Sequence, residues 1–199
     1  MSERRLKGKK IGCVMTGSFC TFKKVFEAWG NLRNEGAELY PIMSFNAAKI
    51  DTRFYQAAQS VMLFEEITGR KVWNTIEEVE PIGPKKLLDA LVVAPCTGNT
   101  LAKIAHSITD TPASLAVKSH LRNGRPVVIA VSTNDGLSGS AINLGKLLAT
   151  RHFFFVPFRQ DDWIAKPNSL VADFDLLAET TAAALENRQI QPLLRPFLP

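Results

Sequence analysis

Small polar residues follow a short apolar run near the middle of this chain. The run, ALVVA at residues 90–94, does not alternate, which predicts a strand that is buried on both faces of a parallel sheet and stops at Pro95. Small or hydrogen-bonding residues come next, and apolar residues then recur at helical spacing: first Cys96, Thr97, Gly98, Asn99 and Thr100, then Leu101, Ala102, Ile104 and Ala105. Such a turn into a helix offers hydroxyls, free N–H groups and the positive end of the helix dipole. We therefore predict an anion site here, and phosphate suits it best.

A second polar turn follows the first predicted strand. Residues 10–16, KIGCVMT, predict that strand, and Gly17 and Ser18 form a tight exit into a helix over residues 21–34. In the flavodoxin-like strand order 2-1-3-4-5, a ligand binds where the first and third strands diverge, at their carboxyl ends. The two polar loops would face each other there. The segment TGSFCT lacks the G-x-G-x-x-G of a dinucleotide site, so a mononucleotide such as FMN is the expected ligand.

The rest of the chain alternates between strands and helices. Further strands are predicted at residues 38–43, 126–131 and 153–156, and further helices at 53–67, 112–123, 139–150 and from Asp173. Polar loops are predicted at residues 44–52 and 132–138, and irregular segments at 70–88 and 157–167. Five strands separated by helices predict an α/β fold, a three-layer doubly wound parallel sheet with right-handed crossovers. With 199 residues and 46% hydrophobic content, the chain can form one domain over residues 1–199.

The net charge of +5 is concentrated at one end of the chain. Residues 1–10 carry +4 of it, which leaves +1 for the other 189 residues. We read residues 1–9 as a solvated basic tail and expect no nucleic-acid partner. No apolar run reaches the roughly 18 residues of a membrane span and the N-terminus lacks a signal-peptide core, so a cytoplasmic protein without membrane contact is expected. The cysteines form no CxxC pair, which argues against a disulfide framework and a metal site.

Five short motifs occur in combination along the chain. They are TGS at residues 16–18, TRF at 52–54, FEEITG at 64–69, VAPCTGNTLAK at 93–103 and NLGKL at 143–147. Together they resemble the flavoprotein family of FMN-binding cysteine and phosphopantothenoylcysteine decarboxylases. The resemblance covers about residues 8–157, and A-P-x-T-x-N-T at residues 94–100 is its most specific part.

This resemblance implies an FMN site and assigns residues to it. Six residues match positions where the family holds the phosphate and ribityl chain: Gly17, Ser18, Ser44, Thr97, Asn99 and Thr100. Five match positions where the family lines the flavin ring: Phe45, Pro95, Ser132, Thr133 and Asn134. Thr16 and Gly98 adjoin these and are counted as cofactor-binding. Asn134 also lies where the decarboxylases have the asparagine of P-x-M-N-x-x-M, which makes it the candidate catalytic residue. The flanking proline and methionines of that motif are missing here.

The chain also departs from the decarboxylases before the central strand. They carry a catalytic histidine where this chain reads EPIG at residues 80–83. The three histidines, at positions 106, 120 and 152, lie in other segments, so cysteine decarboxylation is not expected. Cys96 has no histidine within a few residues to activate it, so we read it as a packing residue.

A second likeness, within the same family, covers almost the whole chain. The motifs DTRF at 51–54, VSTND at 131–135, QDD at 160–162 and KPNS at 166–169 resemble a branch that serves as one component of a two-subunit oxidoreductase. That enzyme converts a dihydrodipicolinate-type precursor to dipicolinate during sporulation. The likeness implies that the partner is a Rossmann-type A subunit, which would bring NADP. It also implies that the substrate is a small dicarboxylate and that the protein works in the mother cell. Arg53, with Lys49 and Arg159, is a candidate for binding the dicarboxylate, because guanidinium donors match carboxylate oxygens.

Three functions are compatible with these resemblances. The first is the oxidoreductase component, in which a flavin or a nicotinamide accepts the hydride. The second is a scaffold that keeps the flavoprotein fold and phosphate pocket while the Rossmann-type partner supplies the chemistry, which the missing histidine and the altered asparagine motif favour. The third is an FMN-dependent decarboxylase of the parent family.

The last nine residues, QPLLRPFLP at 191–199, form an apolar tail that three prolines exclude from a helix. Burial of each large apolar side chain stabilises by about 1.5–3 kcal/mol, so the tail is expected to dock. It can fold back on its own subunit or contact another chain. The habit of the resembled family of forming trimers and larger shells favours the second, and a homo-oligomer is expected.

Overall fold

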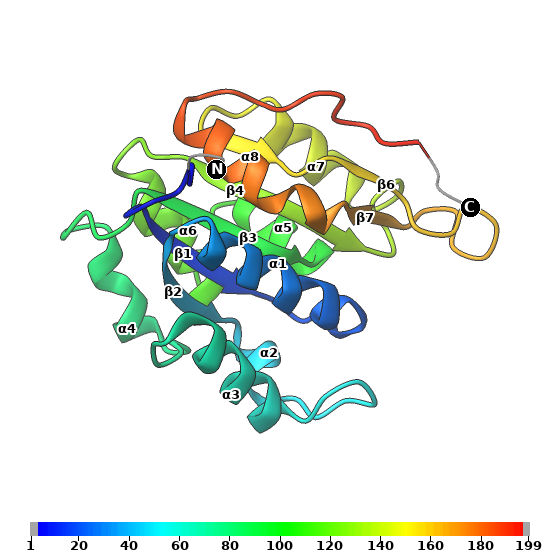
Figure 1. Ribbon diagram of the computed structural model, residues 1–199. Coiled ribbons are helices and arrows are strands. Elements are labelled where there is room, and N and C mark those ends of the chain that lie inside the picture. The colour runs from blue at the N-terminus through cyan, green and yellow to red at the C-terminus, as the bar shows by residue number, and fades with distance from the viewer. Residues whose placement is uncertain (1–3, 197–199) are drawn as a thin grey trace.

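A central β-sheet lies between two layers of helices in the computed structural model, which describes residues 4–196 (Figure 1). The parallel strands lie in the order β2-β1-β3-β4-β5. Their bounds are β1 Lys10–Met15, β2 Glu38–Met43, β3 Ala90–Cys96, β4 Val127–Thr133 and β5 Phe153–Phe155. The predicted α/β fold with the flavodoxin-like order 2-1-3-4-5 is therefore confirmed.

The central strand β3 is buried along its whole length. It pairs with β1 on one side and β4 on the other, so both of its edges are hydrogen-bonded. Its unbroken apolar sequence follows from this position, because helices cover both faces of a parallel sheet and leave no side for polar residues.

Two hydrophobic cores fill the space between the sheet and the helices. The first lies under α1, α3 and α8, and α1 contributes an apolar stripe that includes Phe22, Trp29 and Leu32. The second lies under α5, α6 and α7, on the other face (Figure 1). The helical bounds are η1 Phe19–Thr21, α1 Phe22–Asn34, α2 Phe45–Lys49, α3 Ala57–Thr68, α4 Ile76–Val79, η2 Glu80–Ile82, α5 Gly98–Ala105, α6 Pro112–Leu121, α7 Ala141–Leu148, η3 Phe174–Leu176 and α8 Leu177–Leu185.

The predicted end of the central strand at Pro95 is wrong, because β3 continues to Cys96. The register between β3 and β4 shifts between Val93 and Cys96, and pairing resumes with Cys96 opposite Val131. Proline has no N–H to donate to a ladder, and an irregularity in the pairing is where a strand tolerates it.

The segment between β2 and α3 also differs from its prediction. The expected loop at residues 44–52 contains α2, because the Ser44 side chain accepts a hydrogen bond from the N–H of Ala47 and caps that helix. The next helix begins at Ala57 rather than at Arg53. The Thr52 hydroxyl accepts the N–H groups of the two residues 54 and 55 and holds the chain in a turn there.

Two short strands that were not predicted lie between β5 and the last helix, the first of them within the segment 157–167 that was expected to be irregular. They are β6 Phe158–Gln160 and β7 Leu170–Ala172, which pair antiparallel with each other, and β7 pairs antiparallel with the end of β4. They extend the sheet beyond the carboxyl end of β4. A wall of backbone thus stands beside the predicted ligand site.

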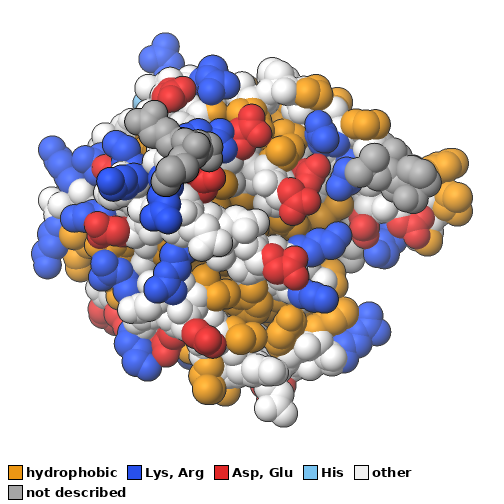
Figure 2. Space-filling model, in the orientation of Figure 1, with side chains coloured by type: hydrophobic (Ala, Val, Ile, Leu, Met, Phe, Trp, Pro, Cys, Tyr) orange, Lys and Arg blue, Asp and Glu red, His pale blue; other side chains and the backbone are white. Residues whose placement is uncertain are grey.

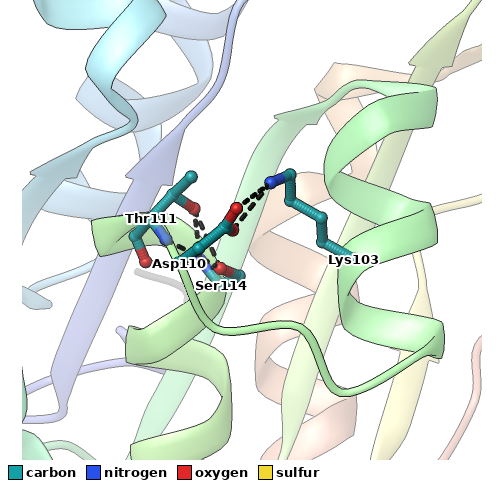
Figure 3. Close-up of polar contacts among 4 residues, drawn as sticks. All are labelled: Lys103, Asp110, Thr111 and Ser114. Carbon is teal, nitrogen blue, oxygen red and sulfur yellow. Dashed lines mark hydrogen bonds and ion pairs between the residues drawn. The ribbon is translucent and has the colours of Figure 1, made fainter.

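An ion pair and a helix cap fix the connection between α5 and α6 (Figure 3). The Lys103 ammonium lies 2.7 and 2.5 Å from the two carboxylate oxygens of Asp110, and this bond lowers the pKa of Asp110. Thr111 caps α6: its hydroxyl accepts the N–H of Ser114, whose hydroxyl accepts the N–H of Thr111 in return. The end of α5 distant from the ligand site is thereby anchored.

Both ends of the described chain pack against the fold. In the segment read as a solvated basic tail, Leu6 is fully buried and the N–H of Gly8 donates to the carbonyl of Gly36, while residues 1–3 lie outside the described range. In the apolar tail, the N–H of Phe158 donates to the carbonyl of Leu193, and the N–H of Arg195 donates to the carbonyl of Phe158. The tail therefore does have a place along β6, although residues 197–199 lie outside the described range. Across residues 4–196, no helix is long and apolar enough to cross a membrane.

Candidate functional site

The carboxyl ends of β1 and β3 lie side by side, and one threonine hydroxyl joins them. These strands are parallel neighbours, with Val14 paired to Val93. Beyond them the Thr16 hydroxyl donates to the carbonyl of Pro95 at 2.7 Å and accepts the N–H of Thr97 at 3.0 Å. Thr16 is fully buried, so its hydroxyl positions the two polar loops and is not exposed to a ligand.

The start of α5 keeps backbone donors for a ligand. The Thr97 side chain caps the helix by accepting the N–H of Thr100 at 3.3 Å, and it donates to the Thr100 hydroxyl at 3.1 Å. The first N–H groups of a helix have no intrahelical acceptor, which leaves those of Gly98 and Asn99. Together with the helix dipole they form a site that favours an anion.

A carboxylate from the loop after β4 already lies at this helix start. Asp135 accepts the Thr133 hydroxyl on Oδ1 at 2.5 Å and the Ser140 hydroxyl on Oδ2 at 2.9 Å. A Cβ added at Gly98 would lie 2.6–2.7 Å from side-chain oxygens of all three residues, so only glycine permits this close approach. The negative carboxylate suits the helix dipole, but it would repel a phosphate placed beside it.

A cavity of about 880 Å³ opens at this end of the sheet. Its lining includes Phe54 and the pair Ser18 and Ser132, whose hydroxyl oxygens are 2.7 Å apart. The start of α1 and the segment from β6 to η3 form the facing walls. In Figure 2 the right side of the molecule is notched, with acidic and basic side chains gathered around the notch. This volume is within the range of small-molecule and cofactor sites, about 300–1,000 Å³.

The structure brings some of the predicted site residues to this cavity and places others behind it. Those that line it are Gly17, Ser18, Thr97, Ser132, Thr133 and Asn134. Those that do not line it are Thr16, Ser44, Phe45, Pro95, Gly98, Asn99, Thr100 and Arg53. Of this second group, Thr16 and Ser44 use their side chains in internal hydrogen bonds, and the Arg53 guanidinium stacks on the Phe54 ring at 4.8 Å. The assignment of these residues to a cofactor stays a prediction.

The cavity also has a wall from which the sequence analysis named only Arg159, as one of three candidates for binding the dicarboxylate. It includes Arg159, Lys166 and Asp173, which β6, β7 and the loop between them hold in place. The charged residues at 159–166 are by themselves equally typical of a solvated loop, so the sequence did not show that they form a wall of the cavity.

Cys20 is an exposed thiol that lines this cavity, but no described histidine lies beside it there. Cys96 is buried, and desolvation raises the pKa of its thiol far above the usual range, as expected of a packing residue. None of the three histidines lines the cavity. Within residues 4–196, no group of three or more His, Cys, Asp or Glu side chains could hold a metal ion.

Comparison with known proteins places this geometry in a family. The Flavoprotein family model matches residues 1–190. The chain belongs to the Flavoprotein family. This flavoprotein is 47% identical over 189 residues to the B subunit of dipicolinate synthase from Bacillus subtilis, an alignment that covers 95% of this chain and 94% of the relative. It is also 36% identical over 130 residues to the coenzyme A biosynthesis bifunctional protein CoaBC of Thermococcus kodakarensis, covering 64% of this chain but 30% of that protein.

Solved structures agree with the sequence comparison. The crystal structure of the B subunit of dipicolinate synthase from Bacillus halodurans C matches the flavoprotein with a TM-score of 0.89 and 39% identity, over 97% of this chain and 99% of that one. The FMN-dependent cysteine decarboxylase SpaF matches with a TM-score of 0.66 and 21% identity, over 90% of this chain and 97% of that one. At that identity the second match shows the shared fold alone.

Proposed function

We propose that this flavoprotein is the B subunit of dipicolinate synthase, which works with the A subunit to convert a dihydrodipicolinate-type precursor to dipicolinate during sporulation. The observation that carries this proposal is the near full-length likeness to the Bacillus subtilis protein, 47% identity over 95% of the chain. The cavity at the carboxyl ends of the strands supports it, because its size and mixed polar lining suit a cofactor and a small acid. The protein would work in the cytoplasm of the mother cell, as a homo-oligomer of trimer size or larger.

The chemistry of the cavity fits an FMN-type group. The hydroxyls of Ser18, Ser132 and Thr133 and the amide of Asn134 line it, and hydroxyls and amides are suitable partners for phosphate, ribityl and ring oxygens. These residues, with Gly17 and Thr97, would hold the cofactor. When bound, FMN supplies an acceptor for the hydride lost as the dihydropyridine ring becomes aromatic. NADP held by the A subunit is the other possible acceptor.

One observation favours the scaffold as a second candidate function. The Asp135 carboxylate lies beside the start of α5, where a flavin phosphate is expected, and like charges at such short range repel. In that case the A subunit would supply all the chemistry, and the cavity would bind the precursor or the A subunit itself. The decarboxylase of the parent family has no such support, because no histidine lines the cavity.

Coexpression with the A subunit separates these functions. The two proteins, each by itself and then together, are assayed for conversion of the precursor to dipicolinate, and the flavin released from this purified protein is measured. We expect dipicolinate only from the mixture, with close to one flavin per chain. Equal synthesis by the A subunit without this protein would contradict the proposal, and synthesis by a flavin-free mixture would support the scaffold. Release of carbon dioxide from a cysteinyl peptide in the presence of FMN would support the decarboxylase.

A further inference from the structure

Two arginines share one carboxylate at the wall of the cavity formed by β6 and β7. Arg159 Nη1 lies 3.8 Å and Arg195 Nε lies 3.6 Å from the same oxygen, Asp173 Oδ2. Backbone hydrogen bonds hold all three residues: Arg159 is in β6, the N–H of Arg195 donates to Phe158 in the same strand, and the N–H of Asp173 donates to Pro157. The cluster therefore carries a net positive charge at a defined position.

The donors of this cluster are incompletely satisfied. Arg159 Nη1 and Arg195 Nε are buried, and neither has a hydrogen-bond partner among the described residues. Their distances from Asp173 exceed those of hydrogen bonds, so the carboxylate neutralises charge without accepting from them. Buried polar groups in folded proteins are nearly always paired, so the single carboxylate does not satisfy this cluster. The Arg159 side chain is 21% exposed and lines the cavity, so the accessible part of its guanidinium can donate to an acceptor that arrives with a ligand.

Strand register places Arg159 opposite the serine pair of the same cavity. Ser132 in β4 is paired with Val171 in β7, and Val171 is paired with Arg159 in β6. Residues that are directly opposite in neighbouring strands project to the same face, and two strand spacings separate Ser132 from Arg159 by about 10 Å. All three residues line the cavity. A small planar molecule across this row would meet hydroxyls at one end, an apolar surface in the middle and a guanidinium at the other end.

The other charges of the cavity do not offer the same site. Lys166 is paired with Asp161 at 2.8 Å, and Lys24, Glu27 and Asp175 are exposed at the surface. In contrast, the Arg159 side chain is 21% exposed and the Asp173 side chain 13%. An anion that enters the cavity would therefore find its strongest shielded donors at Arg159.

We infer that Arg159 binds a carboxylate of a small planar dicarboxylate in this cavity, and that Arg195, which the C-terminal tail delivers, supports it. This inference deepens the proposed function and rests on it for the substrate class. It assigns the dicarboxylate to Arg159 rather than to Arg53, which does not line the cavity. It also gives the tail a role within its own chain.

Binding of dipicolinate, measured by isothermal titration calorimetry with the full chain, tests the site. We expect Arg159→Gln to weaken binding by at least about tenfold, as the loss of a charge-assisted hydrogen bond implies, and Arg195→Gln by about threefold. Arg159→Lys should recover only part of the affinity, because lysine lacks the planar fork. Arg151→Gln, on the exposed surface after α7, is the control and should bind as the wild type does. Thermal unfolding of each variant reports whether it is folded.

Asp173→Asn distinguishes a binding site from a structural ion pair. Both Asp173→Asn and Arg159→Gln break the same pair, so a purely structural role predicts the same effect on ligand affinity. A carboxylate site predicts opposite effects, because removal of Asp173 frees both arginines for the ligand and should tighten dipicolinate binding by about threefold or more. Equal affinities in the wild type and in folded Arg159→Gln, or no binding by the wild type, would overturn the inference.

The binding result and the proposed function can fail separately. If the two proteins together make dipicolinate and folded Arg159→Gln is unimpaired in both binding and synthesis, the inference is wrong while the function stands. If the mixture makes no dipicolinate but the wild type binds it in an Arg159-dependent manner, the carboxylate site stands and the proposed reaction is wrong. Picolinate has one carboxylate fewer and should bind to the wild type more weakly than dipicolinate. A site that does not recognise the second carboxylate would bind the two with equal affinity.

Discussion

The two sides of the cavity satisfy their polar groups in different ways. On the β1–β3 side, the Thr16 hydroxyl is used twice within the protein, and Thr97 and Thr100 are bonded to each other. On the β6–β7 side, buried donors of Arg159 and Arg195 have no hydrogen-bond partner within the described part of the chain. The polar groups of the first side are hydrogen-bonded without a ligand, except for the backbone at the start of α5. The polar groups of the second side are not.

This contrast separates residues that shape a site from residues that bind in it. The motif A-P-x-T-x-N-T contains two hydroxyls that suggest ligand contacts, yet here those of Thr97 and Thr100 bond each other and the Thr97 side chain caps α5. Unpaired buried donors point to the ligand more directly, because leaving them unpaired is costly. The predictions below test this division.

Removal of the Thr16 hydroxyl should have the largest effect on stability. Thr16→Val keeps the shape of the side chain but leaves the Pro95 carbonyl and the Thr97 N–H without their partner in a buried position. At about 1–3 kcal/mol for each unpaired group, the free energy of unfolding should fall by roughly 4 kcal/mol. Urea denaturation measures it. Thr150→Val is the control, because its hydroxyl bonds Lys146 at an exposed helix end, and it should cost less than about 1 kcal/mol.

If Thr16→Val lost under about 1 kcal/mol, the hydroxyl would be free to serve a ligand, and the contrast between the two sides would be weakened. Ser132→Ala should be milder than Thr16→Val, because its hydroxyl faces the cavity. The loss of the Ser132 hydroxyl should instead lower the affinity for a ligand.

Acid should weaken the scaffold that supports both sides. His120 is buried on α6 with Nε2 bonded to the Pro126 carbonyl, and desolvation lowers its pKa to about 4. The unfolded chain binds a proton near pH 6.5, so this contribution is fully present above about pH 6.5 and is lost as the pH falls towards 4. The loss should total roughly 3 kcal/mol.

Denaturation curves from about pH 7 to pH 4 measure this loss, and His120→Gln is the control. Glutamine does not titrate, so this variant should show a flatter pH dependence in that window. An unchanged slope in His120→Gln would assign the acid sensitivity to other groups. Ligand affinities for the two sides are therefore best compared above about pH 6.5.

Two glycines form a matched pair that tests the close approach of Asp135 to α5. Gly98→Ala introduces a Cβ 2.6–2.7 Å from Thr133, Ser140 and Asp135, so the loop must shift, and we expect a loss of about 1–2 kcal/mol. Gly145→Ala lies in the interior of α7 with nothing within 4 Å, and it should stabilise by up to about 1 kcal/mol. Thermal melts compare them. Equal effects of the two variants would show that the approach at Gly98 is not tight.

Much of the fold could be predicted from local pattern, because the parallel strands are apolar along most of their length. β2 begins and ends at the predicted residues, and the meeting of the two polar loops followed from the strand order. The three-residue strands β6 and β7 could not be predicted, because FRQ and LVA carry no periodicity and depend on pairing with each other and with β4.

The candidate site divides in the same way. Ser18 and Thr97 could be predicted to lie near each other because each follows a strand end, and both line the cavity. Arg159 could be named as a possible carboxylate ligand, but its position opposite Ser132 depends on register through Val171. The contact of Asp135 with the start of α5 depends on a close approach that no local pattern encodes.

The smallest effect concerns charge at the start of α5. Asn99→Asp adds a carboxylate beside the predicted phosphate position, and FMN affinity should fall by at least ~1 kcal/mol, the scale of a hydrogen bond to a charged group. Asp135→Asn removes a carboxylate from the same place and should raise FMN affinity by about as much. Quenching of flavin fluorescence measures both. If neither variant changed FMN affinity, the phosphate would bind elsewhere.

A crystal structure with FMN and dipicolinate soaked together tests the division of the cavity most directly. The account predicts the FMN phosphate against the backbone of Gly17, Ser18 and Thr97, and a dipicolinate carboxylate within hydrogen-bonding distance of Arg159. Dipicolinate held by Arg53, or by the Thr16–Thr97 loops with Arg159 still paired only to Asp173, would contradict it.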